Sequence, residues 1–76
     1  MMDKEKFSRL LLDTQAKYLL ERGKHMTNVH RSGQLVALYA MGKRFYEIIY
    51  NYTGKEVVKI EEVNTERVMQ TYLRQL

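Results

Sequence analysis

A stretch in the middle of the chain constrains the fold most, because it has the pattern of a β-hairpin. Residues 35–41 form an uncharged apolar run, and residues 44–52 are rich in aromatic and β-branched side chains. Between the two runs, Gly42-Lys43 supplies a two-residue turn with glycine in its first central position. With that turn, Tyr39 lies opposite Tyr46. The pattern predicts a pair of antiparallel strands at the centre of the fold.

Two helical patterns and one further strand flank this hairpin. Residues 3–22 repeat apolar side chains every three to four positions, as an amphipathic helix does. Residues 24–33 show no period and are predicted to be a loop, whereas residues 56–62 alternate charged and apolar side chains as a third strand. Asn64 is placed to cap a second helix. The predicted fold is α+β: a helix, a three-stranded antiparallel meander and a helix (α-β-β-β-α), in a single domain over residues 1–76.

Alternation of side chains along the strands assigns residues to the two faces of this sheet. Both helices are expected to pack on one face, because that face collects the larger apolar set. Glu47 and Asn51 are expected to point away from the core, since a slip of one residue would bury Glu47. The expected core face consists of Leu35, Ala37, Tyr39, Met41, Tyr46, Ile48, Tyr50, Val58 and Ile60.

Composition limits the classes of protein that remain. The chain has no cysteine, so disulfides and thiolate zinc sites are excluded as sources of stability. A secretory leader is not expected, because Asp13 and Lys17 interrupt the apolar residues near the start, and no run approaches the roughly 20 apolar residues of a membrane span. A cytoplasmic protein without a membrane contact is therefore expected. The net charge of +4 is compatible with an anionic partner but does not require one.

Residues that could perform catalysis do not form a pattern. His25 and His30 lie in the predicted loop without a cysteine or carboxylate nearby in sequence. Glu61 and Glu62 are adjacent on a strand, so they point to opposite faces and cannot act as a paired acid and base. The sequence therefore predicts a protein that is not an enzyme and has no catalytic, metal or cofactor site.

One edge of the predicted sheet lacks protection against pairing with another chain. The strand over residues 35–41 carries no charge, although charged residues usually guard an edge strand. Either the loop 24–33 or another chain is expected to cover this edge. The outer face of the sheet is also half apolar. We therefore predict a protein-interaction or regulatory module, either a homo-oligomer or one half of a complex, with an interface at Val36, Leu38, Phe45 and Ile49.

A nucleic-acid-binding protein is the alternative prediction. Basic side chains gather in the predicted loop, over residues 22–31, and at the tip of the hairpin, over residues 43–44, where they could contact phosphates. These side chains are Arg22, Lys24, His25, His30, Arg31, Lys43 and Arg44.

The element order α-β-β-β-α resembles that of double-stranded-RNA-binding domains. That family opens its last helix with a Gly-Ser-Lys-Lys-like stretch, whereas Asn64-Thr65-Glu66-Arg67 stands at that place in this chain. The resemblance ends at element order, so it assigns no RNA-contacting residue here.

Overall fold

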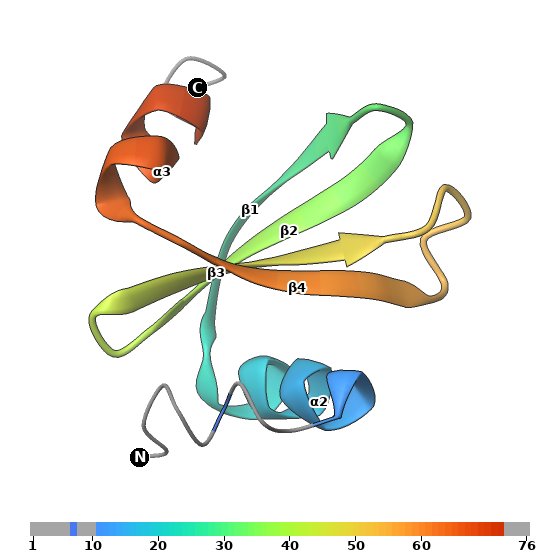
Figure 1. Cartoon of the computed structure of the whole chain (residues 1–76), viewed down its shortest axis with the longest axis horizontal. Helices are drawn as coiled ribbons and strands as arrows, with labels where there is room; N and C mark the ends of the chain where they lie inside the picture. Colours follow the sequence, from blue (N-terminus) through green and yellow to red (C-terminus); the bar gives the residue numbers. More distant parts are fainter. Residues whose placement is uncertain (1–6, 8–10, 73–76) are drawn as a thin grey trace.

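The computed structural model describes Phe7 and residues 11–72, which form an open sheet with one helix on each side (Figure 1). The strands are antiparallel and lie in the order β1-β2-β3-β4, so each strand pairs with its neighbours in sequence. The class α+β is confirmed, whereas the predicted number of strands, three, is wrong. The elements in chain order are α2 (Leu12–Arg22), β1 (Lys24–Arg31), β2 (Gln34–Met41), β3 (Arg44–Tyr50), β4 (Val57–Val63) and α3 (Thr65–Tyr72).

The additional strand is β1, which occupies most of the segment predicted to be a loop. Ser32 and Gly33 turn the chain back onto β2 with φ values of 54° and 77°, as a two-residue hairpin turn requires. Val29 is the one buried residue of β1, and exposed or half-exposed side chains surround it. A strand with a single buried side chain lacks the alternation of apolar and polar residues by which strands are found in sequence. The missing period therefore reflects an edge strand and not a loop.

The central hairpin has the predicted register. Its turn begins at Gly42, whose φ of 65° is a conformation that glycine adopts without strain. Tyr39 lies opposite Tyr46, as expected. The prediction succeeds here because the two-residue turn at Gly42-Lys43 fixes how the two strands pair.

The strand β4 departs from the predicted faces at one residue. A register shift between Ile49 and Tyr50 places Val57 opposite Tyr50. Val58 was predicted to be in the core and is instead 51% exposed, whereas Ile60 packs against the core as predicted. The irregular pairing moves one side chain to the other side of the sheet, which alternation alone cannot foresee.

The helix α2 covers the face of the sheet that was predicted to be the core. Leu19 is fully buried against that face, and Tyr18 packs at its border. The predicted start of this helix at Asp3 lies outside the described residues. The buried cluster consists of Phe7, Leu19, Ala37, Tyr39, Met41, Tyr46 and Ile48.

Gly23 connects α2 to β1 and does not adopt the left-handed conformation that is common after the end of a helix. Its φ of −83° is an extended conformation. A Cβ at this position would lie 2.7 Å from the carbonyl oxygen of Leu19, so the close approach of the two backbone segments accounts for the glycine.

The helix α3 packs on the opposite face of the sheet, so the prediction that both helices share one face is wrong (Figure 1). Val63, the last residue of β4, lies opposite Phe45 and belongs to this second face. Asn64 alone connects β4 to α3, so the helix begins on the side where Val63 points. The predicted cap is confirmed, since the Asn64 Oδ1 accepts a hydrogen bond of 2.8 Å from the backbone N–H of Arg67. No described helix has the length and apolar character needed to cross a membrane.

Candidate interaction surface

The four residues predicted to form a protein interface lie beneath α3. Val36 and Leu38 are 1% and 2% exposed, and Phe45 and Ile49 are half-buried beside them. They pack with Val63 and with residues of α3 into a second core. The supposedly bare strand, now β2, pairs along its outer side with β1. Elements of the same chain therefore cover both the predicted face and the predicted edge.

The open edge on this side of the sheet belongs to β1. Within residues 11–72, no backbone hydrogen bond from outside the sheet reaches this edge. A bulge at Met26 interrupts the pairing of β1 with β2 and leaves residues 27–31 as a regular strand segment. The exposed residues of β1 are Lys24, His25, Met26, Asn28 and His30.

Hairpin geometry determines which backbone groups of β1 face outward. In a two-residue hairpin the residues that flank the turn, Arg31 and Gln34, exchange both of their hydrogen bonds, and such pairs alternate with open pairs along the strands. Arg31 and Val29 therefore direct their N–H and C=O groups toward β2. Those of Asn28 and His30 face away from the sheet. The edge thus presents two donors and two acceptors to an incoming strand.

Charge is distributed unevenly between the two edges of the sheet. Residues 22–46, which include β1 and β2, contain no Asp or Glu. On the opposite edge, β4 carries Glu61 and Glu62, and Lys59 forms an ion pair with Glu61. The edge at β1 is therefore free of carboxylates, whereas the edge at β4 is rich in them.

The structure divides the predicted phosphate-binding residues between two ends of the sheet. Lys24 pairs with Ala40, close to the turn between β2 and β3, and Arg22 ends the helix that leads into β1. Lys43 and Arg44 lie in and directly after that turn. These four exposed cations therefore converge at one end of the sheet. We call this group (Arg22, Lys24, Lys43 and Arg44) the basic end.

The remaining predicted residues lie away from that group or have other contacts. The His25 Nε2 lies 2.7 Å from the Asn28 Oδ1, so this ring is held along β1. His30 is exposed near the opposite end of the strand. Arg31, also at that end, directs its guanidinium to Glu47 and is 33% exposed. The Arg31 guanidinium is therefore less available to bind a phosphate.

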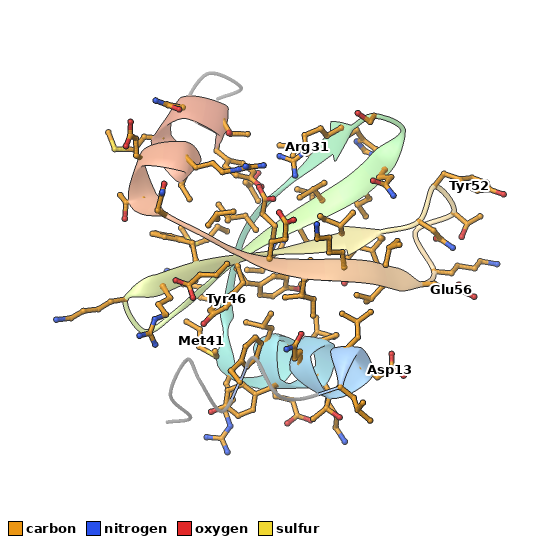
Figure 2. The ribbon with its side chains drawn as sticks, viewed as in Figure 1. Asp13, Arg31, Met41, Tyr46, Tyr52 and Glu56 are labelled. Carbon is orange, nitrogen blue, oxygen red and sulfur yellow. The ribbon has the colours of Figure 1, made fainter. Side chains whose placement is uncertain are left out.

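Glu47 is at the centre of a polar network that connects β1, β3 and α3. It is 0% exposed and is the one buried polar or charged residue within the described part of the chain. Two nitrogens of Arg31 donate to its two carboxylate oxygens at 2.8 and 3.3 Å, and the Tyr72 hydroxyl donates at 2.7 Å. The Arg67 guanidinium lies 4.0 Å away. Figure 2 shows Arg31 on the side of the sheet that faces α3 and Tyr46 on the side that faces α2.

Glu47 was predicted to be exposed, and this prediction is wrong. Its side chain points away from α2, as expected, but α3 covers that side of the sheet. Signals for this were present in the sequence, since Glu47 interrupts a stripe of apolar residues on the outer face. What the sequence does not reveal is that Arg31 and Tyr72, 16 and 25 residues away, meet Glu47 in space.

The protonation states of this network follow from its contacts. Burial by itself would raise the pKa of Glu47, but the hydrogen bonds from Arg31 and Tyr72 outweigh it and hold that pKa below its ordinary value. The hydrogen bond to Glu47 raises the pKa of Arg31. Burial, and then the same kind of hydrogen bond, raises the pKa of Tyr72. Near neutral pH the network is a carboxylate, a guanidinium and a neutral phenol, closed to solvent at the carboxylate.

No cluster of three or more His, Asp or Glu residues that could hold a metal ion occurs among residue 7 and residues 11–72. Glu47 is the buried acid of this region, and its oxygens are occupied by Arg31 and Tyr72. The geometry assigns the network a role in holding α3 on the sheet.

Comparisons of the chain with protein-family models, with curated proteins and with solved structures gave no match.

Proposed function

We propose that the chain is a small non-enzymatic interaction module that binds a partner protein through the edge of β1. The observation that carries the proposal is the open edge itself, at which Asn28 and His30 direct unpaired backbone groups outward. An extended segment that adds to such an edge gains backbone hydrogen bonds along its length, and its alternate side chains supply specificity. The backbone pairing of β1 with β2 holds β1 in the extended conformation that an incoming strand needs.

A different protein is favoured over a second copy as the partner at this edge. If two copies paired in antiparallel fashion through the outward groups of β1, Asn28 of one copy would lie opposite His30 of the other, and only residues 27–31 of each copy would pair. Both copies carry a net charge of +4, and this like charge opposes such a short pairing. Self-association through Val36 and Leu38 would require α3 to leave the sheet, because these side chains are buried beneath it.

An array of extended eight-residue peptides tests the proposal. Asn28→Pro removes the outward N–H of Asn28 while leaving the bonds to β2, and proline is tolerated on an edge strand at such a position. Asn28→Ala is the matched control, because it removes the side chain and keeps the N–H. We expect peptides that bind wild type and Asn28→Ala but lose affinity for Asn28→Pro. Peptides that bind all three proteins equally would contradict the proposal. Light scattering of the free protein at tens of micromolar would detect self-association, which we expect to be absent.

Nucleic-acid binding is a second candidate, and the basic end favours it. Four exposed cations from α2, β1 and the turn between β2 and β3 converge there without a carboxylate in the same segment of chain. Such a group can bind phosphates without reading the base sequence. The two candidates differ in their response to Asn28→Pro, because strand addition uses the outward N–H of Asn28 whereas phosphate binding uses the side chains of the basic end.

A further inference from the structure

We propose that the segment bound by β1 is acidic, an extended stretch of a partner protein with Asp or Glu at alternate positions that joins the sheet as a fifth strand. This inference rests on the proposed function and adds the chemical nature of the partner. It follows from three properties of β1: the open backbone groups of Asn28 and His30, the absence of carboxylates, and exposed cations close to the edge.

The charge around β1 favours an acidic segment. Lys24 is exposed on the strand itself, and Arg22 precedes it by two residues. Lys43 and Arg44 lie two strands further across the sheet, roughly 10 Å away at the usual spacing of about 4.8 Å between strands. This separation is comparable to the Debye length of about 8–10 Å at ordinary ionic strength, so these charges still act at the edge. With no carboxylate between residues 22 and 46, nothing in the adjoining strand opposes them.

The buried acid does not cancel this preference. Glu47 lies two strands inside the sheet and is paired with Arg31, so the two charges largely compensate each other. The fork of Arg31 is held in place by the same contacts. A partner strand therefore meets a neutral network at one end of β1 and, at the other end, Lys24, which forms no ion pair with any residue that the structure describes.

The opposite edge of the sheet, at β4, carries the opposite charge, which supports an acidic partner at β1. There β4 displays Glu61 and Glu62, with Glu56 directly before the strand. An acidic segment would be repelled at β4 and attracted at β1. The two edges therefore differ in the charge of the strand that each can accept.

The probes for the experiment are three fluorescent eight-residue peptides that alternate valine with glutamate, glutamine or lysine. Fluorescence polarisation at about 50 mM salt measures their affinity, and backbone amide NMR locates the contact. We expect the glutamate peptide to bind at least about tenfold more tightly than the other two, with amide shifts centred on Asn28 and His30. Tenfold corresponds to about 1.4 kcal/mol.

Two pairs of variants separate backbone pairing from charge. Asn28→Pro is expected to lower the affinity for the glutamate peptide at least about tenfold, a loss of about 1.4 kcal/mol. Asn28→Ala is expected to keep an affinity close to that of the wild type. Lys24→Glu is expected to weaken the preference for the glutamate peptide, because one of the four cations of the basic end becomes an anion while the other three remain. Lys55→Glu makes the same change in net charge in the loop between β3 and β4, far from β1 in the chain, and should preserve the preference for glutamate.

The outcomes distinguish this inference from the function on which it rests. If all three peptides bind equally and lose affinity on Asn28→Pro, strand addition stands and the acidic preference is wrong. If Asn28→Pro binds the glutamate peptide with the same affinity as the wild type, or if no peptide binds, both proposals are wrong. Thermal unfolding verifies that Asn28→Pro is folded. If Asn28→Pro is unfolded, the amide shifts of the wild type decide whether the peptide binds at β1, and Lys24→Glu decides whether charge sets the preference.

Discussion

The Tyr72 hydroxyl lies 2.7 Å from the Glu47 carboxylate and connects α3 to the central strand β3. Tyr72 is the buried residue of α3, and Val68 is half-buried beside the same cluster. Because few side chains of α3 are buried over its described residues, Thr65–Tyr72, the helix depends strongly on each of their contacts. The network around Glu47 is therefore expected to decide whether α3 stays on the sheet.

Replacing Tyr72 with Phe tests this dependence directly. The ring remains, so the apolar contacts of Tyr72 are kept while the hydrogen bond to Glu47 is lost. A hydrogen bond to a charged group contributes roughly 1.5–3 kcal/mol, and we expect the free energy of unfolding to fall by about that amount. Urea denaturation measures the change. Tyr52→Phe, in an exposed loop, is the control and should change stability by less than about 0.5 kcal/mol.

Glu47→Gln is expected to be more damaging than Tyr72→Phe. The neutral amide leaves the Arg31 guanidinium without its countercharge, and it replaces one accepting carboxylate oxygen with an NH2 group that cannot accept a hydrogen bond. Breaking a buried ion pair costs about 3–5 kcal/mol, and we expect the lower end of that range because Arg31 reaches solvent. Glu56→Gln, an exposed position, is the matched control. If Glu47→Gln lowers the free energy of unfolding as little as Glu56→Gln does, the network does not stabilise the fold.

Stability should also fall in acid because of Glu47. Its pKa is lowered in the folded protein relative to the ordinary value of 4.5, so the unfolded state binds the proton more readily. The contribution of this carboxylate is thus complete above about pH 4.5 and is lost as the pH falls through the lower folded pKa. In urea titrations from pH 7 to pH 3, the gap between wild type and Glu47→Gln should narrow below pH 4.5. A gap that stays constant would contradict the assignment.

The sequence was sufficient to predict the inner hairpin but not the outer strand. The two-residue turn at Gly42-Lys43 fixes the pairing of Tyr39 with Tyr46, so the register of the inner hairpin follows from the sequence. In β1 the side chains of Asn28 and His30 are exposed because they lie at an edge, so apolar residues are not required there. Polar residues are therefore tolerated along this strand, and the strand is recognised only when Ser32-Gly33 is seen to form the turn that connects it to β2.

The binding surface was only partly predictable for a related reason. The basic residues were identified, but a strand at 24–31 separates Lys24 from Arg31 by the length of β1 and places Lys24 close to Lys43. The ion pair of Arg31 with Glu47 depends on contacts across the sheet, which periodicity within one segment cannot report. The absence of acids over residues 22–46 was visible in the sequence, and it acquires meaning only when that segment is seen to form one edge.

Leu38 provides a test of which surfaces are core. The sequence placed it on a surface for self-association, where Leu38→Lys would yield a folded monomer. Because Leu38 is 2% exposed beneath α3, we expect Leu38→Lys to unfold the chain and Leu38→Ala to cost about 2–5 kcal/mol. Val58→Lys, on the exposed side of β4, should be tolerated. Circular dichroism and urea denaturation distinguish these outcomes, and a well-folded Leu38→Lys protein would show that α3 does not cover this site.

The last prediction concerns the basic end and the second candidate function. If Lys24 and Arg44 contact phosphates, the logarithm of the affinity for a labelled duplex should fall linearly with the logarithm of the salt concentration, by about 0.9 units per contact. Lys24→Gln with Arg44→Gln should then weaken binding to all sequences and reduce the slope by about two units. The effect is expected to be similar for duplex RNA and duplex DNA, because phosphates carry no base information.

Lys17→Gln with Lys55→Gln is the matched control, since it removes the same charge from exposed positions outside the basic end. Fluorescence anisotropy from 25 to 200 mM salt, roughly the range over which phosphate contacts lose most of their strength, gives both slopes. A reduced slope in the first pair alone assigns phosphate binding to the basic end. Equal losses in the two pairs would attribute the binding to net charge, and binding that persists without a salt slope would remove nucleic acid as a ligand of this surface. Because Lys24 also lies on β1, competition between the glutamate peptide and the duplex would then establish whether one surface accepts both.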